Sequence, residues 1–367
     1  MADYHEEIER LLAQIPSRAT ELEHLQMAEN ATRLADLHQD EQLAIDARNK
    51  LVQAAVLNGY PEKALVAYSY LLGKFDSKPE LFGGFLDSHM LMWHYKWVID
   101  KLPAFPFISR QQIEDTLGDL ESRFQKLDHA EEAILQYRFR INSKIGEYER
   151  AEAALEELGG LITESSMFSM SDCVACFRSG RVSHYRRRGM WEKAIEEAQP
   201  ILNGEETCGE IPSMFYDVMA IPYLKTGQRA EALALLDKME QEDTARKLDI
   251  THTALLLHAV NDNVSRALEL LERNWHLADG MRERQTPFDF FLAARFLLRQ
   301  LRAAGREEVK LDLNEQLSFY RSENSYPVAE LLEVLDHEIA LIREAFNKRN
   351  GNDQYSLREG WLDDLGV

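Results

Sequence analysis

Three cysteines in this chain have a spacing that suits a metal ion. Cys173 and Cys176 form a Cys-x-x-Cys pair, and Cys208 follows 35 positions after Cys173. Thiolates are soft ligands that Zn²⁺ binds well, and a helix N-terminus lowers the pKa of a thiol. Asp172 has the side chain of an N-cap residue, so we expect both thiols of the pair at the first turn of a helix. This pattern predicts a zinc site formed by Cys173, Cys176 and Cys208.

A tetrahedral zinc site needs a fourth ligand, and the motif does not contain one. Several side chains could supply it, as could water: His129, His184, Glu210 and His252. The alternative is that Cys173 and Cys176 are ordinary helix residues and that Cys208 falls near them by coincidence. A redox-active pair is disfavoured, because such a pair normally accompanies a βαβ pattern that the chain does not show.

A basic helical face follows the cysteines. Arg178, Arg181, Tyr185 and Arg188 recur at spacings that place them on one side of a helix, in a chain whose net charge is −21. Arginine can hold a carboxylate or a phosphate through two hydrogen bonds, so this arginine face is a candidate binding site for an acidic group of a peptide or protein. The alternative is that the arginines pair with acidic residues of neighbouring helices, for example Glu192, Glu196 or Glu197.

The elements that must position these residues are amphipathic helices, because apolar residues recur with a period near 3.6 and convincing strands are few. Many helices are joined by a turn of the form Gly-x-x-x-x-Ala. Its glycine ends one helix, and its small alanine lets the next helix pack closely. A period of this size predicts one helical hairpin per repeat. These turns and their variants lie 35 to 44 residues apart, at Gly59, Pro103, Gly146, Gly189, Gly227, Asp262 and Gly305.

The turn resembles the second half of the tetratricopeptide repeat, and the copy from Gly227 to Met239 matches best. The resemblance covers roughly residues 40 to 322, although most first helices lack the Trp, Leu-Gly and Tyr of that family. It implies an all-α, right-handed α-solenoid of antiparallel hairpins whose first helices line a concave groove. The Ser-Asp-Cys-x-x-Cys sequence is also similar to uncharacterised bacterial repeat proteins. Since Cys173 and Cys208 are about one repeat apart, the solenoid would bring the three thiols to one edge.

The domain organisation follows from the repeats. We expect a repeat array over residues 1–325 whose first helices form an N-terminal cap, and a C-terminal capping helix over residues 326–350. Residues 351–367 form a polar, acidic tail with one large apolar residue, Trp361, beside Leu362 and Leu365. Whether this tail docks on the array cannot be decided from the sequence.

Composition narrows the classes of partner. The 367-residue chain has 42 Lys and Arg against 63 Asp and Glu, which disfavours nucleic acid and anionic membranes as partners. No apolar run approaches the roughly 20 residues of a membrane span, and the first residues lack the pattern of a signal peptide. Three cysteines do not form the disulfide framework of a secreted protein. We therefore expect a cytoplasmic protein.

The predicted function is that of a non-enzymatic scaffold or adaptor that binds a protein or peptide in the groove of the solenoid. One alternative is a receptor for a signalling peptide that controls an effector protein. Another is a zinc-dependent enzyme built on the cysteines. An enzyme is the less favoured class, because the chain contains no His-Glu-x-x-His, Walker glycine loop or Gly-x-Ser-x-Gly motif.

Overall fold

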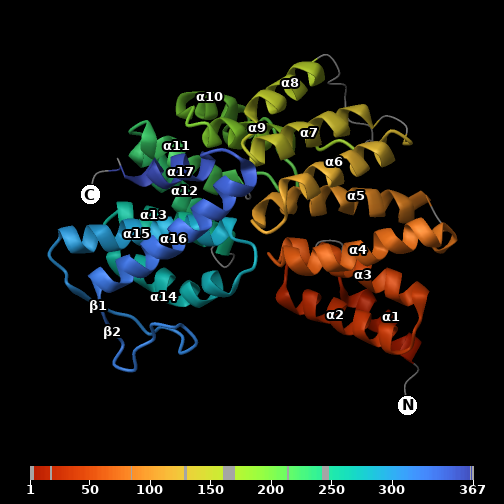
Figure 1. The fold of residues 1–367 in the computed structure, drawn as a ribbon, viewed down its shortest axis with the longest axis horizontal. Coiled ribbons are helices and arrows are strands. Elements are labelled where there is room, and N and C mark those ends of the chain that lie inside the picture. Colours follow the sequence, from red (N-terminus) through yellow and green to blue (C-terminus); the bar gives the residue numbers. More distant parts are fainter. Residues whose placement is uncertain are drawn as a thin grey trace. The chain divides into compact units, whose positions relative to one another are not determined.

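The computed structural model describes residues 4–16, 19–83, 85–127, 130–159, 170–212, 215–241, 248–363 and 365 (Figure 1). Within these residues the chain forms helices α1 to α17, and its only sheet is a short two-stranded ladder. The all-α prediction is confirmed in this sense. None of the described helices is both long enough and apolar enough to cross a lipid bilayer.

The chain divides into two compact units. Unit 1 comprises residues 1–102 and 113–131, and unit 2 comprises residues 103–112 and 132–367. In unit 1, each helix from α1 to α5 packs on the next, and α3 also contacts α1 and α5. The helices of this part are α1 (Tyr4–Gln14), α2 (Leu22–Leu37), α3 (Glu41–Leu57), α4 (Pro61–Ser77), η1 (Pro79–Leu81), α5 (Phe85–Lys101) and α6 (Arg110–Phe124).

Unit 2 repeats the same pattern of contacts. Each helix from α9 to α14 packs on the next, and α9, α11, α13 and α15 contact one another in series. Its elements are η2 (Leu102–Ala104), α7 (Glu131–Lys144), α8 (Tyr148–Leu158), α9 (Val174–Arg187), α10 (Trp191–Leu202), α11 (Tyr216–Lys225), α12 (Arg229–Gln241), α13 (Leu248–Val260), α14 (Val264–Gly280), α15 (Gln285–Ala303), β1 (Glu308–Lys310), β2 (Ser325–Pro327), α16 (Val328–Asn350), α17 (Gln354–Glu359) and η5 (Gly360–Leu362).

The hairpin turns have the conformation that the glycines predict. Gly146, Gly189 and Gly227 all have φ between +69° and +81°, the left-handed region that side chains with a Cβ atom rarely adopt. The alanine five positions later in each turn is fully buried, because it lies where the second helix approaches the first: Ala151, Ala194 and Ala232. The local structure that joins successive helices is therefore encoded in the turn itself.

Residues 306–327 differ from the helical hairpin expected after Gly305. The chain leaves α15 and runs through β1 and β2, which pair antiparallel with Val309 opposite Tyr326. Val309, Leu311 and Leu313 are buried while the residues between them are more exposed. That alternation has the period of a strand and not of a helix. The next helix, α16, then packs on α15.

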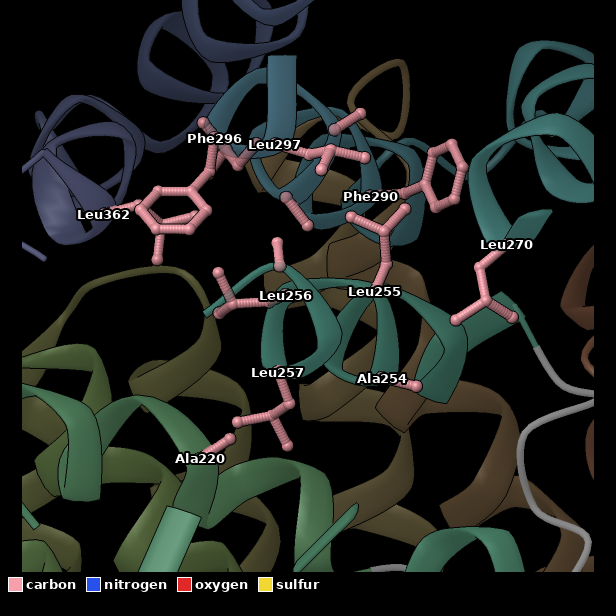
Figure 2. Close-up of a cluster of buried hydrophobic side chains, with 14 of the residues drawn as sticks. Ala220, Ala254, Leu255, Leu256, Leu257, Leu270, Phe290, Phe296, Leu297 and Leu362 are labelled. Atoms are coloured by element: carbon pink, nitrogen blue, oxygen red, sulfur yellow. The ribbon is translucent and has the colours of Figure 1, made fainter. Parts of the chain in front are cut away.

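The core of unit 2 surrounds α13, which is buried on more than one face. Figure 2 shows Leu255 of α13 facing Phe290 of α15, while Leu257 faces Ala220 of α11. Leu362, which belongs to η5 near the end of the chain, lies in the same cluster beside Phe296. The core therefore joins the helical hairpins to the last described segment.

Candidate metal centre and docked C-terminal segment

The first thiol begins helix α9. Cys173 is the N-cap residue, and its Sγ atom accepts a hydrogen bond from the backbone N–H of Cys176 at 3.4 Å. The prediction that Asp172 is the N-cap is wrong. The carboxylate of Asp172 instead pairs with Arg140 at 3.2 Å, and its backbone N–H donates to Gln136 at 2.7 Å.

The three predicted metal ligands lie together. The Sγ atoms of Cys173, Cys176 and Cys208 all lie within 4.8 Å of one another, and those of Cys176 and Cys208 are 3.5 Å apart. Zn–S bonds of about 2.3 Å in a tetrahedron separate the sulfur atoms by roughly 3.8 Å. The thiol cluster, defined as these three residues, therefore fits a zinc ion with small movements.

A tight loop after α10 brings Cys208 to α9. The backbone N–H of Cys208 donates to the carbonyl oxygen of Ile211 at 3.0 Å, and the N–H of Glu210 donates to the Sγ atom of Cys208 at 3.4 Å. N–H groups directed at sulfur stabilise the thiolate over the thiol. Both ends of the cluster thus carry a backbone N–H donor directed at sulfur.

The pKa values of the paired thiols are driven apart by their contact. The hydrogen bond with Cys176 lowers the pKa of Cys173 to about 5, and the backbone N–H of Cys176 also lowers it. The same contact raises the pKa of Cys176, and burial raises it further. At neutral pH Cys173 is therefore a thiolate that accepts a hydrogen bond from the protonated thiol of Cys176. Metal binding requires the loss of that proton, so metal affinity at this site rises with pH.

None of the suggested fourth ligands joins the thiol cluster among the described residues, where only the three cysteines group within ligand distance. His184 hydrogen-bonds Ser143 at 3.0 Å and contacts Phe139, so its ring is directed toward α7. Burial is the main cause that lowers the pKa of His184 to about 3. Glu210 lies outside the group of ligand atoms, and His129 lies outside the described residues. His252 lines a different site, described below.

The arginine face contacts acidic residues of this chain. Arg178 holds the carboxylate of Glu206 through Nε and Nη2 at 2.6 and 2.7 Å, and it holds Glu197 through Nη1 at 2.6 Å. Arg181 also pairs with Glu197, at 2.7 Å, and Tyr185 is buried. Glu206 belongs to the loop that carries Cys208.

Arg188 pairs with Glu152 of α8. Each of the three predicted ligand-binding arginines thus has a carboxylate partner within the protein. This arrangement agrees with the alternative that the sequence offered for the arginine face, in which Glu197 was named. Binding of an external acidic group by this face stays a prediction.

No protein-family model matches the chain, and no curated protein matches it.

A second feature lies at the end of the chain. Residues 352–363, here called the docked segment, pack on the rest of unit 2 through α17, which Figure 1 labels, and through η5. The ring of Tyr355 is 1% exposed and stacks on Phe346 of α16, with ring centroids 4.1 Å apart. It also contacts Phe288 of α15 at 5.0 Å. The part of the predicted tail around Trp361 therefore docks, which the sequence left open.

Ion pairs hold the docked segment from two helices. Arg358 is 3% exposed and donates from Nη2 to both carboxylate oxygens of Asp289 on α15, at 2.6 and 2.7 Å. The next residue, Glu359, accepts from Arg295 of α15 at 2.8 Å and from Arg343 of α16 at 2.6 Å. The segment and the helices beneath it are complementary in charge.

Aromatic contacts hold the end of the segment. The ring of Trp361 meets that of Trp191 edge to face, with centroids 5.4 Å apart. The guanidinium of Arg186, on α9, lies 5.8 Å above the same ring of Trp361. The residues that anchor the segment recur at every third position: Tyr355, Arg358 and Trp361. This spacing is the signal in the sequence that could have indicated a buried helical face.

A cavity of about 20 Å³ remains where the segment meets α9 and α15. It is lined by Arg186, Asp289, Arg358 and Trp361, together with His252 and apolar side chains. The Nε atom of Arg186 is buried without a hydrogen-bond partner. Burial lowers the pKa of Arg186; Asp217 and Asp289 oppose this effect, and the positive charge of Arg358 adds to it.

Proposed function

We propose that this chain is a non-enzymatic scaffold that binds a peptide or protein segment. The fold behind the proposal is a right-handed solenoid of tetratricopeptide-like hairpins. Its support is that hairpins pack in chain order and that α9, α11, α13 and α15 contact one another in series, as nearest-neighbour repeats do. A solenoid of this kind presents a row of first helices to a partner.

One observation carries the proposal: unit 2 holds a short helical segment of its own chain through specific side-chain contacts. The contacts come from α15, α16 and the first residue of α10, and they combine ion pairs with aromatic packing. Helix-in-groove recognition of peptides likewise uses anchor side chains that lie three or four residues apart on a short helix. The surface therefore has the chemistry of a peptide-binding site.

The test of this function is selection of ligands from a random peptide library on the full-length protein. We expect peptides with Kd values on the order of 10 µM, as measured by isothermal titration calorimetry, and no binding by their scrambled versions. Crosslinking should place these peptides on unit 2. If no peptide binds in preference to its scrambled form, the scaffold proposal is wrong.

We also propose that the thiol cluster binds zinc as a structural link between two successive hairpins. The supporting observation is the approach of the three Sγ atoms within 4.8 Å, with backbone N–H donors at Cys173 and Cys208. A bound zinc ion would join the start of α9 to the loop that follows α10. Reduced thiols suit a reducing compartment, so a cytoplasmic location is part of this proposal.

Elemental analysis tests the metal proposal directly. Protein purified without added metal should contain close to one zinc ion per chain. Cys208→Ser should lose most of it, because two thiolates bind zinc far more weakly than three. Thr207→Ser, at the neighbouring exposed position, is the matched control and should keep its zinc. Wild-type protein without zinc would show that the cluster is not a zinc site.

A further inference from the structure

The surface beneath the docked segment presents three recognition groups in a fixed order. Asp289 faces a cation, Arg295 and Arg343 face a carboxylate, and the ring of Trp191 packs against an aromatic ring. All four residues belong to helices of at least 12 residues, so the groups are held on rigid elements. The segment meets them with Arg358, Glu359 and Trp361, which fall within one helical turn.

The occupant fits this surface incompletely. Arg358 and Gln354 are each only 3% exposed. The Nε atom of Arg358 and the Oε1 atom of Gln354 are buried without hydrogen-bond partners. Arg186 makes no ion pair with a described residue, and its Nε atom is also unpartnered. The cavity of about 20 Å³ lies beside these groups. Polar atoms buried without partners weaken the docked state, because their hydrogen bonds to water are lost without replacement.

The segment is also joined to the rest of unit 2 in a way that allows it to leave its site. α17 has only 6 residues, and Gly351, with φ +72°, separates it from α16. Glycine in this conformation ends the long helix and permits the chain to change direction. A short helix after a glycine turn can be exchanged without unfolding the helices beneath it.

We propose that this surface is a recognition site for peptides that carry the sequence pattern cation, carboxylate, any residue, aromatic, and that the docked segment occupies the site until such a peptide replaces it. The proposal rests on the scaffold function and adds the class of ligand. It also makes the chain a receptor in which peptide binding releases the docked segment. A tethered occupant competes at an effective concentration in the millimolar range, so the site selects against weak ligands.

Fluorescence anisotropy with a labelled peptide of residues 352–363 tests the proposal. The titrated proteins are the full-length wild type, the opened variant Arg358→Ala/Trp361→Ala, and Leu357→Ala as a matched control. Leu357 is in the same helix but is 59% exposed. We expect the opened variant to bind the peptide at least about tenfold more tightly than the wild type and the control, because its own segment competes less.

Exchange of the charges at Arg358 of the peptide and Asp289 of the protein tests whether the peptide binds at this site. A peptide with Arg358→Asp should not bind the opened variant, and it should bind when that variant also carries Asp289→Arg. Arg358→Gln, which removes the charge but keeps the aromatic anchor and a polar side chain, replaces the double variant if circular dichroism shows that the latter has lost helix. A folded variant that binds the peptide no better than the wild type overturns the proposal.

The two proposals fail in different ways. If library peptides bind the protein but neither compete with the 352–363 peptide nor carry the pattern, the scaffold function stands and the recognition site is wrong. If no peptide of any sequence binds the wild type or the opened variant, the scaffold function itself is wrong.

Discussion

Arg178 links a helix, its partner helix and the loop that completes the thiol cluster. Its guanidinium holds Glu197 of α10 with one nitrogen and Glu206 with two others. Glu206 precedes Cys208 by two residues, so this ion pair fixes the loop from which the third thiol projects. Exposed ion pairs contribute little to stability, but this one is partly buried, with side chains 22% and 20% exposed. Arg178 thus supports the loop of the candidate metal centre.

Arg178→Ala is expected to lower the zinc affinity by about 10- to 100-fold, the range seen when an outer residue that orients a ligand is removed. Competition with a chromophoric chelator measures this affinity. Arg266→Ala removes an ion pair within α14 and should leave the zinc affinity unchanged. An Arg178→Ala protein with wild-type affinity would show that the loop holds Cys208 without Glu206.

The sequence was sufficient to find the thiol cluster and insufficient to find its support. Cys173 and Cys208 were predicted to meet because they are about one repeat apart, and they do. The N-cap lies one residue later than the sequence predicts, at Cys173, because Arg140, from another helix, holds the carboxylate of Asp172. The link from Arg178 to Glu206 depends on how side chains from different elements meet, which spacing along one helix does not encode.

At the scale of elements, the glycine turns invite a comparison of two positions. Gly227 has φ +75° and open space where a Cβ atom would lie, whereas a Cβ at Gly146 would lie 2.5 Å from the side chain of Asn352. Asn352 belongs to the docked segment and donates to the carbonyl oxygen of Ile145 at 2.8 Å. The turn at Gly227 has open space beside it, whereas the turn at Gly146 also contacts the docked segment.

Gly227→Ala should therefore lower the free energy of unfolding by about 1–2 kcal/mol, the cost of the left-handed conformation for a residue with a Cβ atom. Gly146→Ala should have a similar cost and should also displace Asn352. Chemical denaturation measures the first effect, and limited proteolysis of residues 352–363 measures the second. Equal protease sensitivity of the two variants would contradict the contact between Asn352 and the turn.

Residues 306–327, which contain β1 and β2, show where the repeat period predicts the wrong structure. Gly305 has the position and the conformation of the other turn glycines, with φ +76°. The residues after it alternate in burial, so the period of the next segment is that of a strand. The turn motif predicts how a helix ends, and only the pattern that follows predicts what comes next.

At the scale of the molecule, unit 2 contains contacts that no repeat period predicts. The guanidinium of Arg349 donates to the carbonyl oxygens of Pro103, Phe105 and Ile108 at 2.7, 3.1 and 3.2 Å. These partners lie more than 240 residues earlier in the chain. Nearest-neighbour repeats explain the contacts between successive hairpins. The contact between Arg349 and residues 103–108 could be predicted only from the path of the whole unit.

The division into two units predicts a local response to metal removal. Chelation of zinc should speed amide hydrogen exchange at the start of α9 and in residues 203–212, because the link between these hairpins is lost. Unit 1 should keep its exchange rates, since the cysteines lie in unit 2. Hydrogen exchange with mass spectrometry, with and without a chelator, compares the two. Uniform acceleration across the chain would indicate that zinc supports global and not local stability.

The position of the docked segment has a consequence for the time at which the protein is made. A ribosome synthesises the helices that contact the segment, among them α9, α10, α15 and α16, before it reaches residues 352–363. Since domains begin to fold during synthesis, the surface around Asp289 and Trp191 forms on a nascent chain that has no segment to place there. A peptide or chaperone present at that moment meets the site without a competitor, whereas one that arrives after translation must displace the segment.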